Sequence, residues 1–220
     1  MMRQIDIPDI VIRRLPIYAR SLEYLLSEGI TTVSSSELGA RIDVTAAQIR
    51  RDLSYFGEFG KQGKGYNVQF LLTQIRDILN LERIWGVVLV GVGHLGQAIA
   101  RYGGFRDKGF EIQALCDADP KKVGTTLEGM EIQHYSHIPE IVKTKGLEVA
   151  IVAVPVSHAQ ETVDLLVQAG IKAILNYAPI TVQVPADVRI SIIDPVAALQ
   201  SMTFYLDSQT GFKNNNGRTH

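Results

Sequence analysis

The stretch "WGVVLVGVGHLGQAIARY" (residues 85–102) constrains the fold of this chain more than any other. A buried apolar strand runs into Gly91-x-Gly93-x-x-Gly96, and a segment typical of a helix follows. Three glycines at this spacing are weak evidence alone, but between a strand and a helix they are typical of a dinucleotide-binding turn. We expect Gly91 to make the turn, Gly93 to admit a pyrophosphate, and Gly96 to let the helix pack closely.

A second strand, "FEIQALCD", ends in a carboxylate. Asp117 follows Gly96 by 21 residues, the separation expected for a side chain that bonds the adenosine ribose. Asp117 would repel the 2′-phosphate of NADP, so we expect the ligand to be NAD+/NADH, although Lys121 and Lys122 stand close in sequence. The other residues of the glycine turn expected at this cofactor are Val92, His94 and Leu95.

Three further apolar strands, "LEVAIVAVP", "IKAILNYAP" and "VRISIIDP", alternate with helical segments. This alternation predicts an α/β fold with a doubly wound parallel sheet of the Rossmann type. Asp117, Pro155 and Asn176 stand where strands end, at the ligand edge of such a sheet. We therefore expect Val154, Pro155 and Asn176 to lie at the cofactor.

The N-terminal third predicts three amphipathic helices. "PIYARSLEYLLSEG" is the first, with Pro16 in its first turn and Gly29 as its C-terminal cap. Ser34 and Glu37 have the spacing of a capping box for a second, short helix. Thr45 caps the third, and the tight turn before it predicts a helix-turn-helix.

The third helix has an apolar side and a polar, basic side. Its expected buried stripe is Ala46, Ile49, Leu53 and Phe56. Asp52 is expected at one margin, which leaves the outward side nearly free of acidic residues. The hydroxyl, amide and guanidinium groups on this outward side can hydrogen-bond base edges and phosphates in a major groove. The candidate DNA contacts are Thr45, Ala47, Gln48, Arg50, Arg51, Ser54 and Tyr55.

A glycine-rich segment, "GEFGKQGKGY" (residues 57–66), follows the third helix. We interpret it as a hairpin in which Lys61, Gly63 and Lys64 approach phosphates. A helix-turn-helix with a basic hairpin is a winged helix. The alternative is a small helical cap with a glycine loop. A fourth amphipathic segment, "NVQFLLTQIRDILN", would close the core of this small domain.

No catalytic set of residues emerges from the rest of the chain. Cys116 is the single cysteine, so no intramolecular disulfide forms and a cytoplasmic protein is expected, with Cys116 as a buried core thiol. His94 belongs to the glycine turn, and His158 is expected to start a helix near the cofactor. His134 and His137 are expected in a surface loop, with no metal bound.

Three functions are compatible with these features. The first is a DNA-binding regulator for which the bound dinucleotide is the signal. The second is a small NAD-dependent oxidoreductase whose N-terminal domain only mediates assembly. The third is a nucleotide-sensing adaptor without a DNA role. The net charge of −1 favours none of them, whereas the basic helix and glycine segment favour the first.

From about Arg13 to Leu206 the chain resembles the Rex family of bacterial redox-sensing repressors. The resemblance is carried by "RRLPIYARSLEYL", "VTAAQIRRDLSYFGEFGKQGKGYNV", "LVGVGHLGQAIARYGGF", "DADPKKVG" and "AGIKAILNYAP". It implies a homodimer that binds palindromic double-stranded operator DNA with NAD+ bound and leaves it with NADH. It departs from the family where Arg51 replaces a common lysine, at Pro195, and at His94.

The resemblance also implies roles for single residues and segments. Arg14, Tyr102 and Asp194 would couple the nicotinamide redox state to the DNA-binding domains, and Tyr102 and Phe204 would lie at the nicotinamide. The expected domains are a winged helix (residues 1–82), a Rossmann domain (83–195), a C-terminal helix swapped between subunits (196–207) and a disordered tail (208–220).

Overall fold

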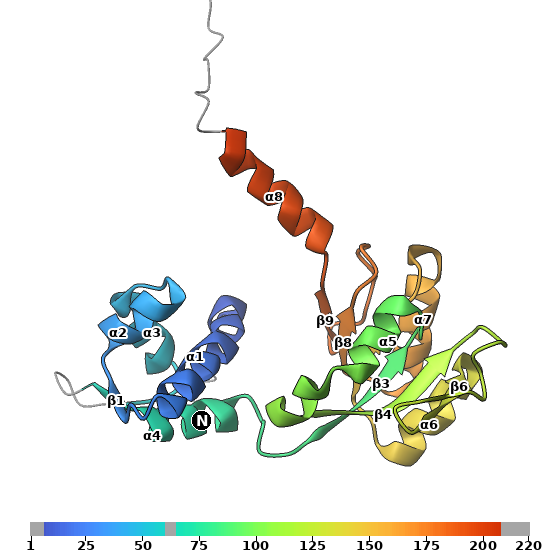
Figure 1. Ribbon diagram of the computed structural model, residues 1–220, viewed down its shortest axis with the longest axis horizontal. Helices are drawn as coiled ribbons and strands as arrows, with labels where there is room; N and C mark the ends of the chain where they lie inside the picture. Colours follow the sequence, from blue (N-terminus) through green and yellow to red (C-terminus); the bar gives the residue numbers. More distant parts are fainter. Residues whose placement is uncertain (1–6, 60–64, 208–220) are drawn as a thin grey trace, which may run out of the picture. The chain divides into compact units, whose positions relative to one another are not determined.

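The computed structural model describes residues 7–59 and 65–207, and the chain divides into two compact units, Met1–Arg83 and Ile84–His220 (Figure 1). The predicted tail, residues 208–220, lies outside the described residues. The elements of the N-terminal unit are α1 (Asp9–Ser27), β1 (Thr32–Val33), α2 (Ser35–Ile42), α3 (Ala46–Ser54), β2 (Tyr66–Asn67) and α4 (Val68–Ile78).

The first helix, α1, is longer than predicted. Its buried residues begin at Val11 and recur with helical spacing, so the helix starts at Asp9 and Pro16 lies in its interior. The prediction that Pro16 stands in the first turn is wrong, because the apolar pattern continues on its N-terminal side. The predicted glycine cap is confirmed: Gly29 has φ 77°, and its amide donates to the carbonyl of Leu26 at 3.0 Å.

The helix-turn-helix is confirmed in α2 and α3. Ser34 and Glu37 form the reciprocal capping box before α2. Thr45 caps α3 by accepting a hydrogen bond from the Gln48 amide at 3.2 Å. The four residues of the predicted stripe, Ala46, Ile49, Leu53 and Phe56, are buried or half-buried. Of these, Ile49, Leu53 and Phe56 pack in the N-terminal core.

The glycine-rich segment leads into β2, which pairs with a strand the sequence did not predict. The register is antiparallel, with Thr32 opposite Asn67 and Val33 opposite Tyr66. The tip of the predicted hairpin, with Lys61, Gly63 and Lys64, lies outside the described residues. The predicted fourth helix is present as α4, where the Asn67 side chain accepts from the Phe70 amide at 2.8 Å.

The C-terminal unit is a seven-stranded sheet in the order β5-β6-β4-β3-β7-β8-β9. All pairs are parallel except β5 with β6, and the central position of β3 marks a doubly wound topology. Its elements are β3 (Trp85–Val90), α5 (His94–Arg101), β4 (Phe110–Asp117), β5 (Thr126–Leu127), β6 (Met130–His134), α6 (Ile138–Lys145), β7 (Val149–Val152), α7 (Val156–Ala169), β8 (Ala173–Asn176), β9 (Arg189–Ile192) and α8 (Pro195–Asp207).

Alternate residues of β3 point into two different cores. Val88 and Val90 pack against buried residues of α6 and α7. Val87 and Leu89 pack on the other face with Ile99 of α5. This burial of both faces is what the continuous apolar strand of the glycine motif predicts for a parallel sheet.

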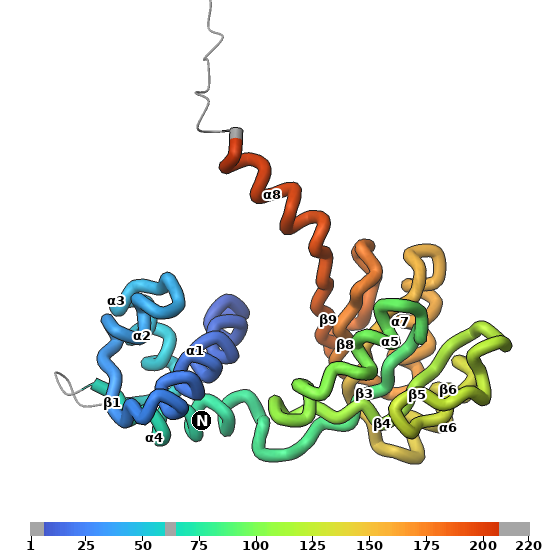
Figure 2. Tube along the Cα trace, viewed as in Figure 1, coloured from blue at the N-terminus to red at the C-terminus, as the bar shows by residue number. Residues whose placement is uncertain are grey.

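The pair β5–β6, which Figure 2 traces beside β4, was not predicted. β5 has only two residues, and β6 contains one charged and several half-exposed residues. His134 ends β6, and His137 belongs to a 3₁₀ turn, Tyr135–His137. The prediction of a surface loop is therefore wrong for His134, which ends a strand, whereas His137 is exposed in the turn that follows.

One face of the sheet carries an apolar groove of about 330 Å³. It is lined mainly by Phe105, Phe110, Val149, Ile151 and Leu175, with Arg189 at β9. The last helix, α8, is apolar on every side, and its large side chains are 57–77% exposed. Of the helices in residues 7–59 and 65–207, none is both long and apolar enough to span a bilayer.

Candidate dinucleotide and nucleic-acid sites

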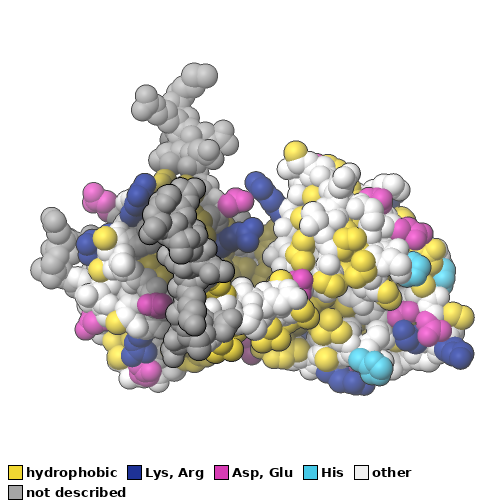
Figure 3. Space-filling model, turned by 90° about the horizontal axis from the view of Figure 1, so that it is seen from above, with side chains coloured by type: hydrophobic (Ala, Val, Ile, Leu, Met, Phe, Trp, Pro, Cys, Tyr) yellow, Lys and Arg dark blue, Asp and Glu magenta, His cyan; other side chains and the backbone are white. Residues whose placement is uncertain are grey.

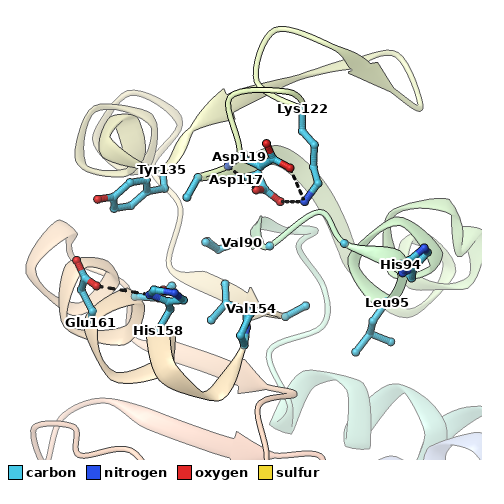
Figure 4. Close-up of a pocket in the computed structure, with 16 residues that line it drawn as sticks. Val90, His94, Leu95, Asp117, Asp119, Lys122, Tyr135, Val154, His158 and Glu161 are labelled. Atoms are coloured by element: carbon cyan, nitrogen blue, oxygen red, sulfur yellow. Dashed lines mark hydrogen bonds and ion pairs between the residues drawn. The ribbon is translucent and has the colours of Figure 1, made fainter.

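A pocket of about 690 Å³ lies at the carboxyl ends of β3, β4 and β7 (Figure 4). This is the point where the chain changes its direction of winding across the sheet, which is where ligands bind in open α/β folds. Asp117, Asp119 and Lys122 lie along one wall, His158 and Glu161 along another. His94 and Leu95, at the start of α5, form a third.

The three glycines occupy the conformations that the motif predicts. Gly91 has φ 93°, and a Cβ there would meet the carbonyl oxygen of Ala153 at 2.5 Å. A Cβ at Gly96 would overlap the carbonyl oxygen of Gly91, so α5 packs directly on the turn. A Cβ at Gly93 would have no heavy atom within 4 Å. The backbone at Gly93 is therefore open to a ligand at the amino end of α5.

The carboxylate of Asp117 is 8% exposed and binds its own chain. One oxygen, Oδ2, accepts from the Val92 amide at 2.6 Å and from Lys122 Nζ at 3.0 Å, and Oδ1 accepts from the Asp119 amide at 2.8 Å. Burial alone would raise the pKa of Asp117, but these donors hold it below its ordinary value. Because a carboxylate has about four acceptor positions, Oδ1 keeps one for a ribose hydroxyl.

The other predicted cofactor residues fall into two groups. Pocket-lining residues are Gly91, Gly93, His94, Leu95, Asp117, Val154 and Pro155. Val92 and Gly96 are buried behind the turn. Asn176 is fully buried, and its side chain accepts from the Ala178 amide and donates to the Ala178 carbonyl. It holds its own loop, so contact between this side chain and a cofactor stays a prediction.

The sequence did not predict four of the pocket's polar or aromatic residues: Asp119, Tyr135, Glu161 and Thr162. Tyr135 follows the unpredicted β6, which explains why it was missed. Glu161 and Thr162 stand three and four residues after His158 on α7, so helical periodicity from His158 could have found them.

The other side chains considered for chemistry are His158 and Cys116. His158 lines the pocket near the start of α7, as predicted. Cys116 is fully buried in β4, and burial raises the pKa of its thiol to about 12. Among the described residues, no three His, Cys, Asp or Glu side chains are grouped to hold a metal ion.

The three residues expected to form the redox switch have local partners. Arg14 binds Asp52 within the N-terminal unit. Tyr102 packs edge-on against Phe105, with ring centroids 5.3 Å apart. Asp194 caps α8 by accepting from the amides of residues 196 and 197 at 3.0 and 3.1 Å. Phe204 packs against Tyr205 on α8. The switch itself, with Tyr102 and Phe204 at the nicotinamide, stays a prediction.

The predicted DNA-reading side of α3 is largely exposed. Thr45, Ala47, Arg50, Arg51 and Ser54 are exposed, and Tyr55 and Gln48 are half-buried. Arg50 donates to the Ser35 hydroxyl at 2.8 Å, which links α3 to α2. The methyl group of Ala47 and the guanidinium of Arg51 are therefore exposed on the side predicted to face base edges and phosphates.

Two side chains of α3 differ from the prediction. Asp52 was expected at the margin of the outward side but is 0% exposed. The reason is a bidentate ion pair: Arg14 Nε and Nη2 donate to its two oxygens at 2.6 and 2.8 Å. Gln48 turns toward the same carboxylate and donates to Oδ1 at 2.7 Å.

Hydrophobic side chains spread over the upper face of the C-terminal unit, and its charged and histidine side chains gather toward one side (Figure 3). The pocket lining has the same character, since only a few charged groups stand among apolar residues. A pocket with this lining suits a ligand that has aromatic rings and a few polar groups.

Family models match both units. Residues 6–54 match a model described as "Putative DNA-binding protein N-terminus", and residues 82–180 match one described as "CoA binding domain". The first match covers the helix-turn-helix, and the second covers the glycine turn with most of the sheet.

Two relatives that match more than nine-tenths of the chain share one name. A redox-sensing transcriptional repressor Rex from Roseiflexus sp. (strain RS-1) is 60% identical over 206 residues, 94% of each chain. The Rex protein of Syntrophomonas wolfei is 43% identical over 205 residues, 93% of this chain and 98% of its own.

Solved structures agree with these relatives. The crystal structure of RSP with β-NAD+ and operator DNA matches with a TM-score of 0.90 and 38% identity, over 97% of this chain and 98% of that one. RSP with β-NADH matches with a TM-score of 0.85 and 35% identity, over 94% and 97%. With this identity along nearly the whole length of both its units, the chain belongs to the Rex family of redox-sensing transcriptional repressors.

Proposed function

We propose that this protein is a transcriptional repressor that binds operator DNA as a homodimer and leaves it when NADH replaces NAD+. The observation that carries the proposal is the presence, on one chain, of a helix-turn-helix with an exposed basic side and a dinucleotide-type pocket. Relatives that span more than nine-tenths of the chain are named repressors and not enzymes. The oxidoreductase alternative therefore has no support from them.

The pocket residues fit a dinucleotide. The open backbone at Gly93 and the start of α5 suit a pyrophosphate, and Asp117 suits a ribose. Asp117 and Asp119 would repel the 2′-phosphate of NADP, and Lys122 is already paired with Asp117. NAD(H) is therefore preferred. The bound nicotinamide supplies the signal, since it is positively charged when oxidised and neutral when reduced.

A switch requires contacts that differ between the two redox forms. Arg14, Tyr102 and Asp194 are the residues we assign to this coupling. Asp194 stands between β9 and α8 with its carboxylate at the first amides of the helix. A change in the charge near Asp194 would alter the start of α8 and so favour one arrangement of the dimer over the other.

The shape of α8 supports a swapped dimer. A helix that is apolar on every side needs contacts on more than one side to leave water. Val196, Leu199, Met202 and Leu206 are all 61–77% exposed. The apolar groove on the sheet offers a matching surface on a second copy. Deleting residues 195–220 should convert the dimer to a monomer in sedimentation velocity, and an unchanged dimer would contradict the swap.

DNA binding is assigned to α3 and the wing. Arg51, Ala47 and Ser54 would contact bases, whereas Thr45, Arg50, Tyr55 and the wing residues Lys61, Gly63 and Lys64 would contact phosphates. Gln48 was also predicted to contact the DNA. Two such units in a homodimer suit a palindromic operator, because half-sites mirror the symmetry of the protein. DNA binding and the single Cys116 both suit a cytoplasmic protein.

The proposal is tested by fluorescence anisotropy of a labelled palindromic operator at fixed salt and fixed NAD+, with NADH titrated in. We expect tight binding with NAD+ and release at low NADH. A scrambled duplex of the same length is the control, because it measures the sequence-independent part of binding. Operator binding that does not change with NADH would refute the redox response, and equal binding to both duplexes would refute the repressor assignment.

A further inference from the structure

The carboxylate of Asp52 is saturated by donors inside the N-terminal unit. Of the three charged residues of α3, Arg50 and Arg51 are exposed, whereas Asp52 is 0% exposed. Each of its oxygens accepts two hydrogen bonds: Oδ2 from Arg14 Nε (2.6 Å) and the Tyr18 hydroxyl (2.6 Å), and Oδ1 from Arg14 Nη2 (2.8 Å) and Gln48 Nε2 (2.7 Å). Four bonds exhaust the acceptor capacity of a carboxylate.

These bonds join two helices. Arg14 and Tyr18 lie one turn apart on α1, and Gln48 lies one turn before Asp52 on α3. Tyr18 is itself fully buried, so the network stands between the helices and not at the surface. A buried carboxylate is costly unless it is fully paired, and the last turn of a helix is unfavourable for a negative charge. The position of Asp52 in α3 therefore depends on its donors from α1.

Fixing Asp52 also fixes the direction of its neighbours. Successive residues of an α-helix differ by about 100° around the axis, so Arg51 leaves α3 about a quarter turn from Asp52. Ser54 leaves about 160° away from Asp52. A rotation of α3 that broke the Asp52 bonds would move both outward side chains together.

We infer that Asp52 is a positioning residue for operator recognition, which sets the rotation of α3 on α1 so that Arg51 and Ser54 face the bases. It does so without contacting DNA. The same network holds the Gln48 side chain back, so Gln48 acts with Asp52 and not as a base contact. This inference rests on the proposed function, because it assumes that α3 is the helix that reads the operator.

The test compares Asp52→Asn with Glu28→Gln as a matched control. Glu28 also accepts a bidentate pair, from Arg41 at 2.7 and 3.3 Å, but both partners are exposed. Both substitutions remove one charge from such a pair and keep the side-chain shape. The measured quantity is the ratio of affinities for operator and for a scrambled duplex, by anisotropy in the presence of NAD+.

We expect Asp52→Asn to lower operator affinity about tenfold, as expected for a lost base contact, and the scrambled duplex to lose much less. Glu28→Gln should leave the ratio unchanged. A folded Asp52→Asn protein whose ratio equals that of the wild type would overturn the inference. Tyr18→Phe removes one of the four bonds and keeps the ring packing. It should lower the ratio by a smaller factor, and it decides the question if Asp52→Asn does not fold.

Hydrogen exchange provides a readout that does not need DNA. Backbone amides of α3 should exchange faster in Asp52→Asn and Tyr18→Phe than in the wild type, with α4 unchanged as an internal reference. Unchanged exchange in α3 would overturn the positioning role. If the wild type fails to bind any operator, the proposed repressor function fails, whereas exchange in α3 still decides whether Asp52 holds this helix.

Discussion

The carboxylate of Asp117 accepts a hydrogen bond from the backbone amide of Val92 at 2.6 Å. This bond joins the end of β4 to the glycine turn after β3, 25 residues earlier in the chain. The residue predicted to bond the ribose therefore also holds the turn that would receive the pyrophosphate. Loss of its charge would weaken both parts of the site together.

Asp117→Asn should weaken NADH binding about tenfold to a hundredfold. A hydrogen bond to a charged group contributes about 1.5–3 kcal/mol, and each 1.4 kcal/mol is a factor of ten. Titration of NADH fluorescence measures the dissociation constant. Asp187→Asn is the control, since it removes an exposed carboxylate paired with Lys172 at 2.6 Å in the same unit. Equal effects of the two substitutions would contradict the role of Asp117.

Gly93→Ala should impair NADH binding, whereas Gly96→Ala should impair stability. The open space at Gly93 accepts a methyl group, so Gly93→Ala should keep its melting temperature and lose NADH affinity because the methyl occupies the pyrophosphate position. Gly96→Ala places a Cβ against the Gly91 carbonyl and should lower the melting temperature by several degrees. Calorimetry with and without NADH separates the two. A destabilised Gly93→Ala protein with normal affinity would reverse our assignment.

Arg51→Ala should weaken operator binding by about 1–3 kcal/mol, the contribution of an arginine that contacts a base. The side chain is exposed on α3, so its removal should leave the fold intact. Arg20→Ala makes the same charge change on the exposed side of α1 and is the matched control. Anisotropy at two salt concentrations measures both variants. Equal affinity of the two variants would remove Arg51 from the recognition surface.

Asp194→Ala should weaken the response to NADH, but it also removes a helix cap worth about 0.5–2 kcal/mol. Asp194→Asn separates these effects, because asparagine keeps a capping oxygen and loses the charge. We expect Asp194→Asn to retain the dimer and still require more NADH for DNA release. Release of DNA by Asp194→Asn at the wild-type NADH/NAD+ ratio would exclude its charge from the switch.

Acid should destabilise the N-terminal unit through Asp52. Burial would raise the pKa of this carboxyl, but bonds from Arg14, Tyr18 and Gln48 hold it below the ordinary value of about 4. The stabilisation is therefore present above about pH 4 and is lost as pH falls through the lowered pKa. Urea unfolding of the wild type and Asp52→Asn should differ at pH 6, and the difference should shrink as pH falls below about 4. A difference independent of pH would assign the effect to packing.

Local patterns predicted most of the architecture, because caps, glycine turns and apolar periodicity depend on residues close in sequence. The glycine turn and the capping box at Ser34 are examples. Asp52 was misplaced because its main partner, Arg14, is 38 residues away, and no local pattern distinguishes a buried paired carboxylate from one at the margin. The β5–β6 pair was missed because the two residues of β5 are too few to show a period, and β6 has a single buried residue, Ile132.

The burial of Cys116 affects which kind of oxidation this repressor can sense. Its thiol is fully buried, and the pKa of about 12 leaves almost no thiolate at neutral pH, so peroxide and disulfide reagents find no reactive sulfur. The sequence has no second cysteine with which it could form an intramolecular disulfide. The response therefore follows the exchange of a bound metabolite. We expect a change in the dinucleotide pool to reverse it without chemical repair of the protein.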